Sequence, residues 1–288
     1  MDAEPVRLHY NASPEDVALL KSALPDSEPI GDMLEFEHTL RQVGEALPQA
    51  GLPGAFNYVY WHLTRGTRRA ARGEYNDEMP YPVFDMPDKI EKTAGIFGEF
   101  YFRQLRSLVR YAEGDQVAFD EVSQSWQIAL LHPEVQGAGN DWKQFIAGMK
   151  THIESELAPT LKLSGLDEDY YGDYTHGMHR LFHITSHDIA PVLVPGHLPH
   201  GLKRAVAVPV LGHIANIRET SWHHSYEIAE PDTPEFEADI DTLDIYTANR
   251  IEKTLRLGRS VTRLAAAIQP IEDSRAVDWT ASYELAAA

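Results

Sequence analysis

Histidine is concentrated in the second half of the chain, where nine of the 14 histidines lie between residues 176 and 224. His176, His179, His183 and His187 recur at the spacing of a single helical face. Two imidazoles at i and i+4 can bind one metal ion. The stripe is about 16 Å long at the rise of an α-helix, so all four cannot share one ion. Asp188 follows directly and is placed to be a further ligand or a hydrogen-bond acceptor for one.

A second group of ligand-type side chains follows further along the chain. Glu219, His223 and Glu227 are spaced by four residues, so they share one helical face and offer nitrogen and oxygen ligands together. In the N-terminal half, Glu35 and His38 have the Glu-x-x-His spacing of carboxylate-bridged metal bundles; whether they reach the C-terminal group stays open. The expected metal ligands are His179, His183, His187, Asp188 and His223, and the expected catalytic groups are His187, Glu219 and Glu227.

The function that we favour from these residues is an oxygenase-like oxidoreductase that uses iron or haem. His183, His187 and His223 would ligate iron, and Arg68 or Arg69 would pair with the propionates of a haem. The expected substrate is a small aromatic molecule, because the aromatic segment 56–61 suits a pocket for such a ligand.

Two other functions fit the same side chains. In a zinc-dependent hydrolase or lyase, the histidines would bind zinc, zinc would activate a water, and Glu219 or Glu227 would be the base. In a non-catalytic protein that binds a small ligand, the histidines would form a hydrogen-bonded polar network instead.

Composition narrows the remaining classes. The chain has no cysteine, which excludes disulfides, thiolate nucleophiles and iron–sulfur clusters. Its formal net charge of -19 would repel nucleic acids and anionic membranes, so neither is an expected partner. The absence of a signal peptide and of a membrane-length apolar run predicts a cytoplasmic protein; a homodimer is compatible with the sequence. No dinucleotide-binding motif, phosphate loop, nucleophile elbow or His-Glu-x-x-His pattern is present.

Helical periodicity runs through nearly the whole chain, and no segment alternates as a strand does. The expected helices span 13–24, 32–47, 55–72, 88–112, 116–131, 141–157, about 172–187, 203–229 with a kink at Pro209, and 235–267. Glycine, asparagine and proline predict a loop over 73–86. We therefore predict an all-α fold, a single-domain helical bundle of about eight to ten helices over residues 1–288, with the last ~20 residues as a weakly ordered tail.

Three segments also carry a family resemblance. The first is the aromatic helix from Phe56 to Gly73 with its closing Arg-Gly, and the third is the Arg-x-x-x-Trp stretch from Ile217 to Trp222. The second, Met178 to Asp188, contains His183 and Ile184, and has His187 one residue before Asp188. It is similar to the His-Ile-x-x-Asp-Leu core of an uncharacterised family of helical bacterial proteins, a domain of unknown function, in which Asp stands at the position of His187. The resemblance implies an all-helical architecture and importance of His183, and it brings no known activity.

Overall fold

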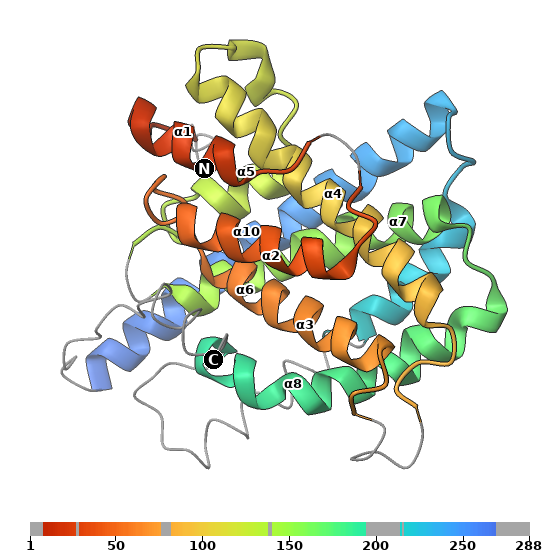
Figure 1. Ribbon diagram of the computed structural model, residues 1–288. Helices are drawn as coiled ribbons and strands as arrows, with labels where there is room; N and C mark the ends of the chain where they lie inside the picture. Colours follow the sequence, from red (N-terminus) through yellow and green to blue (C-terminus); the bar gives the residue numbers. More distant parts are fainter. Residues whose placement is uncertain are drawn as a thin grey trace.

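The computed structural model describes residues 8–26, 29–75, 82–137, 140–193, 214 and 216–268, without the side chains of residues 183, 186, 187, 190–193 and 257–268. Every regular element in this part of the chain is a helix (Figure 1), which confirms the predicted all-α fold. No described helix is both long enough and apolar enough to cross a bilayer. Residues 203–213 of the expected helix 203–229 and the expected tail lie outside the described residues.

The helices follow the sequence patterns closely in the first half of the chain. The α-helices there are α1 (Pro14–Ala23), α2 (Met33–Ala46), α3 (Ala55–Ala71), α4 (Pro87–Ala112) and α5 (Gln124–Leu131). Those of the second half are α6 (Asp141–Lys150), α7 (Leu157–Ser164), α8 (Met178–Leu193) and α10 (Pro234–Ile268), and residues 216–227 are helical as well. Shorter turns are the 3-10 elements η1 (Gln116–Phe119) and η3 (Glu168–Tyr170) and the π-helical elements η2 (Thr151–Ser155) and η4 (Asp173–Gly177).

Three expected helix bounds are wrong. The span 116–131 is not one helix, because Ser123 ends the turn that follows η1 and caps α5, its hydroxyl accepting from the N–H of Trp126. The span 141–157 is interrupted by the π-helical η2 and continues as α7 to Ser164. Helix α8 runs on to Leu193 instead of ending at residue 187.

Helix α3 lies at the centre of the fold. It contacts α2, α4, α6 and α8, which lie around it in Figure 1. A helix covered on several sides needs apolar or aromatic side chains on more than one face, and Phe56, Tyr60 and Trp61 are all buried. Gly148 lets α6 come close, since a Cβ there would lie 2.6 Å from the Cβ of Phe56. This contact holds the chain that leads into η2 against α3.

Candidate functional site

A buried histidine and a buried glutamate lie one turn apart in the middle of the molecule. His152 and Glu156 are 2% and 4% exposed, and His152 belongs to η2. Phe145, Met149, His152 and Glu156 are spaced as a core-facing helical stripe is. The apolar pattern of α6 therefore carries two ionisable side chains into the core.

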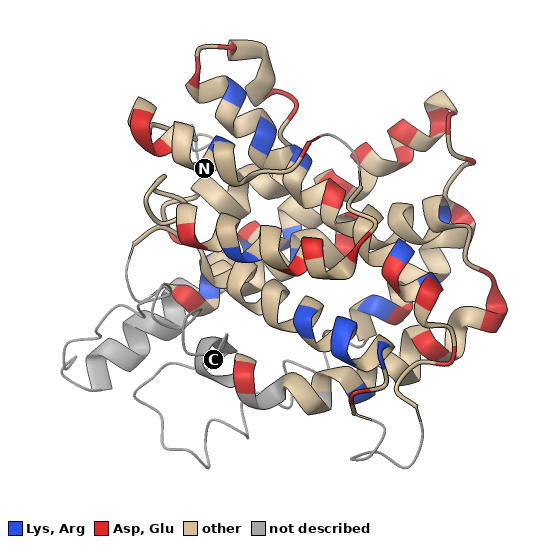
Figure 2. Cartoon of the chain, viewed as in Figure 1, with Lys and Arg blue, Asp and Glu red and all other residues tan. Residues whose placement is uncertain are grey.

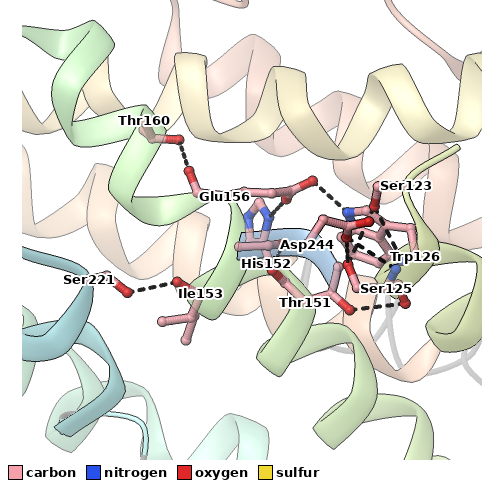
Figure 3. A network of polar contacts seen from close by, with 11 residues as sticks. Ser123, Ser125, Trp126, Thr151, His152, Ile153, Glu156, Thr160, Ser221 and Asp244 are labelled. Atoms are coloured by element: carbon pink, nitrogen blue, oxygen red, sulfur yellow. Dashed lines mark hydrogen bonds and ion pairs between the residues drawn. The ribbon is translucent and has the colours of Figure 1, made fainter. Parts of the chain in front are cut away.

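The carboxyl group of Glu156 holds the ring of His152 from one side (Figure 3). Its Oε2 lies 2.6 Å from Nδ1 of His152, and its Oε1 accepts a 2.6 Å hydrogen bond from the indole N–H of Trp126. The ring stacks on Phe97 with centroids 3.5 Å apart, and it meets Tyr60 edge-on at 4.6 Å. Contacts from α3, α4 and α5 therefore fix one orientation of the imidazole. In this orientation Nδ1 faces Glu156, and Nε2 makes no hydrogen bond with it.

Burial decides the protonation of this pair. It lowers the pKa of His152 well below its usual value and raises the pKa of Glu156 well above its own, so the pair is favoured without net charge. Oε1 of Glu156 already accepts a hydrogen bond from Trp126, so the proton of the carboxyl group is on Oε2. This proton forms the hydrogen bond between Oε2 and Nδ1 of His152. In a neutral pair the second proton is then on Nε2 of His152, which makes this nitrogen a hydrogen-bond donor.

Two donors on adjacent rings have no acceptor in the described part of the chain. Nε2 of His152 is one, and the hydroxyl of Tyr60 is the other. Burial raises the pKa of Tyr60 well above 10, so this hydroxyl keeps its proton. Leaving a buried donor unpaired costs about 1–3 kcal/mol. The arrangement indicates a place for a ligand that accepts hydrogen bonds.

A cavity of about 90 Å³ lies beside these two rings. His152 and Tyr60 line it together with mainly apolar side chains from α4, α7 and α8, among them Phe97, Leu157 and Phe182. A single water needs about 10–15 Å³ on a comparable scale. The cavity therefore has room for a group of several atoms.

A surface groove of about 190 Å³ adjoins the cavity. Tyr174, Met178, Phe182 and Arg218 line both spaces, so they form the passage between them. Tyr174 comes from the π-helical η4, just as His152 comes from the π-helical η2. Single π turns occur often at functional sites, and here both contribute to one cavity.

The groove brings together two residues of the site expected from the sequence. His179 and Glu219 both line it and are exposed, and Glu219 accepts a 3.3 Å hydrogen bond from the hydroxyl of Tyr171. His223 and Glu227 are also exposed but do not line the groove. The side chains of residues 183 and 187, expected as ligands, lie outside the described part.

The two arginines expected to hold haem propionates are engaged in ion pairs. Nε of Arg68 lies 2.6 Å from Glu37, and Nε of Arg69 lies 2.7 Å from Glu74. Figure 2 shows several basic residues at the C-terminal end of α3. Each of these two therefore has part of its hydrogen-bonding capacity taken up within the fold.

The structure separates the remaining expected ligands. Glu35 and His38 are exposed on α2, and neither lines the groove or the cavity. Within the described residues, no group of three or more His, Asp or Glu side chains could hold a metal ion.

Asp188, the last expected ligand, lines a separate pocket of about 270 Å³. His62, Arg65 and Arg69 line it as well. Nδ1 of His62 lies 3.8 Å from a carboxylate oxygen of Asp188, and the histidine is 4% exposed. Asp188 thus faces a buried histidine of α3.

This histidine makes the stability of the protein depend on pH. Burial lowers the pKa of His62 to about 4; Asp188 partly offsets this, and Arg65 lowers the pKa further. The pKa in an unfolded chain is about 6.5. The unfolded chain therefore binds the proton more readily than the folded protein does. The contribution of His62 to the free energy of unfolding is complete above pH ~6.5 and is lost as the pH falls toward 4.

We expect the free energy of unfolding of the wild type to fall by about 2 kcal/mol more than that of a His62→Asn variant between pH 7 and pH 4.5. Urea denaturation at several pH values measures both, and the variant serves as the control for all other carboxyl and histidine groups. Parallel curves for the two proteins would contradict the assignment to His62.

Sequence reasoning missed His152 and Glu156, although a signal for them is present. The prediction of the site rested on the concentration of histidine in the second half, and segment 141–157 was predicted only as a helix. The signal is two ionisable residues at core-facing positions, in register with Phe145 and Met149. The partner Trp126 could not be found this way, since it lies 30 residues from Glu156 in the chain.

Comparison with known proteins bears on the family alone. No curated protein and no solved structure matches the chain. One family model matches residues 35–257, which is more than half of the chain and includes the three segments of the resemblance described above. His152, Glu156 and Arg218 also lie inside the match. The chain therefore belongs to the Family of unknown function (DUF5995), which confirms the expected membership of an uncharacterised family.

Proposed function

We propose that the protein binds a small, largely apolar molecule in the cavity and anchors it by a hydrogen bond from Nε2 of His152. The observation that supports this most is a buried imidazole donor that finds no acceptor among the described residues and lies at the wall of an apolar cavity. An acceptor on the ligand would satisfy it and remove the penalty of an unpaired donor. The hydroxyl of Tyr60 offers a second donor to the same ligand.

The wall of the cavity favours an aromatic ligand. Phe97, Tyr60, Tyr170 and Tyr174 line it, and aromatic rings pack well edge-on or offset against such side chains. Ligand sites are commonly apolar cavities with a few polar groups that set the orientation, and the cavity has this composition. This supports the small aromatic molecule expected from the sequence.

Binding of 3-phenylpropionamide, a neutral aromatic amide, tests the proposal. Saturation-transfer NMR should show saturable binding to the wild type. Met178 lines the passage and takes no part in the hydrogen bonds of the His152–Glu156 pair, so Met178→Trp should abolish binding by closing the passage. The control is Val117→Trp on η1, because Val117 is 67% exposed and lies outside the groove and cavity. Absence of binding to the wild type, or equal binding to Met178→Trp, would overturn the proposal.

Acid–base catalysis is a second candidate, and the hydrogen-bonded pair favours it. If Nε2 of His152 gave its proton to a bound molecule, the proton between Oε2 and Nδ1 would pass to Nδ1. The imidazole would stay neutral, and the negative charge would rest on Glu156, where the indole N–H of Trp126 stabilises it. A Glu156→Gln variant should still bind 3-phenylpropionamide but could not supply this proton.

The metal- or haem-dependent oxidoreductase stays a prediction, with zinc chemistry as its alternative. Elemental analysis and an ultraviolet–visible spectrum of the purified protein test both. Iron or a Soret band would support the oxidoreductase and direct mutagenesis to His183 and His187, whereas zinc alone would favour the hydrolase or lyase. Absence of metal and chromophore, also after reconstitution, would rule out both.

A further inference from the structure

We propose that the ligand of this cavity carries a carboxylate, and that Arg218 binds it at the passage between groove and cavity. The inference rests on the proposed function and narrows its ligand to one chemical class. The ligand would be a small aromatic or aliphatic acid, with its apolar body in the cavity and its acidic end in the groove.

Arg218 is the one Lys or Arg side chain among the described residues that line the groove or the cavity, and it lines both. The guanidinium lies over the ring of Tyr174, with its central carbon 4.5 Å from the centroid. The hydroxyl of Tyr174 in turn donates a 2.5 Å hydrogen bond to the backbone carbonyl of Arg218. The two residues therefore hold each other in place at the passage.

The positive charge of Arg218 has no carboxylate partner within 4 Å in the part of the chain that the structure describes. This differs from Arg68, Arg69, Arg106 and Arg110, which all form ion pairs with Asp or Glu. Glu219 is its neighbour and lines the same groove, but it accepts a hydrogen bond from Tyr171 instead. A half-buried guanidinium beside an apolar cavity thus keeps its donors for a ligand.

The geometry suits a carboxylate in particular. A guanidinium presents paired N–H groups that match the two oxygens of a carboxylate. The other end of the ligand would meet the donors of His152 and Tyr60, which favour an acceptor such as a carbonyl or ether oxygen. An acid of this kind would satisfy the charge at the passage and the donors inside at the same time.

The test compares 3-phenylpropionate with 3-phenylpropionamide, two probes of nearly the same shape that differ in charge. Titration followed by NMR should show the carboxylate binding the wild type about tenfold more tightly than the amide. Arg218→Met should remove this preference while the amide still binds, and Arg218→Lys should restore part of it. Glu219→Gln should increase the preference, because it removes the opposing charge in the groove.

Arg256→Met is the matched control, since Arg256 is exposed on α10, pairs with Glu252 and lies outside both spaces. Equal affinity of the wild type for the two probes, or a preference that persists in Arg218→Met, would overturn the role of Arg218 while leaving the cavity proposal intact. Failure of both probes to bind the wild type would overturn the cavity proposal and this inference with it.

Discussion

The Glu156→Ala variant is expected to be less stable than the wild type by about 2–6 kcal/mol, because two buried polar groups lose their partner and each costs about 1–3 kcal/mol when it is left unpaired. The substitution leaves the indole N–H of Trp126 and Nδ1 of His152 without their partner. Both groups are buried. Urea denaturation followed by far-ultraviolet circular dichroism measures the loss.

Glu156→Gln provides the control of nearly equal size. Its amide oxygen can accept from Trp126 and its amide N–H can donate to Nδ1 of His152, so most of the stability should be retained. A loss below about 1 kcal/mol for the alanine variant would be typical of an ordinary surface change, and it would contradict the buried network.

Asp244→Ala is expected to lower the stability by about 2–4 kcal/mol, through lost hydrogen bonds to a charged acceptor and a lost helix cap. Asp244 is 8% exposed on α10. Its oxygens accept from the backbone N–H groups of Gln124 and Ser125 at 2.6 and 3.1 Å, and from the hydroxyl of Ser125 (Figure 3). The carboxylate thus satisfies donors at the start of α5, the helix that carries Trp126.

The comparison for this variant is Asp241→Ala, in which an exposed carboxylate one turn earlier on α10 is removed. It should change the free energy of unfolding by no more than about 0.5 kcal/mol. Thermal unfolding of the two variants side by side separates the buried contact from the change in net charge. Equal melting temperatures for both would show that the cap contributes nothing measurable.

Local signals explain why most of the fold could be predicted. Ser13 before Pro14 marks one helix start, and the apolar spacing from Met33 to Leu47 indicates a second helix. The structure confirms both helices and shows Asp32 as the N-cap of the second. The start of α5 was missed because its cap combines Ser123 with Asp244, which lies 120 residues from Gln124 in the chain. Ser123 is a local N-cap signal, whereas the part of the cap that Asp244 supplies from a distant helix has none.

The candidate site was harder to predict for a related reason. Helical spacing shows which side chains share a face, but it does not show whether another helix covers that face. His176 and His179 recur at helical spacing, as His223 does with Glu219 and Glu227, and all three histidines are exposed. His152, by contrast, is an isolated histidine in the sequence and is buried by α3, α4 and α5. Tertiary packing, which depends on residues far apart in the chain, determines this difference.

The two π-helical turns have a consequence for how such a protein can change during evolution. A π turn accommodates one residue more than the α-helix that it interrupts, so deletion of a single residue from η2 would restore regular α-helical geometry. Because each residue turns an α-helix by about 100°, the deletion would rotate His152 relative to Glu156 and α7. The same holds for Tyr174 in η4. A plain helical bundle could therefore gain or lose this cavity through one-residue insertions and deletions, while its core composition stays the same.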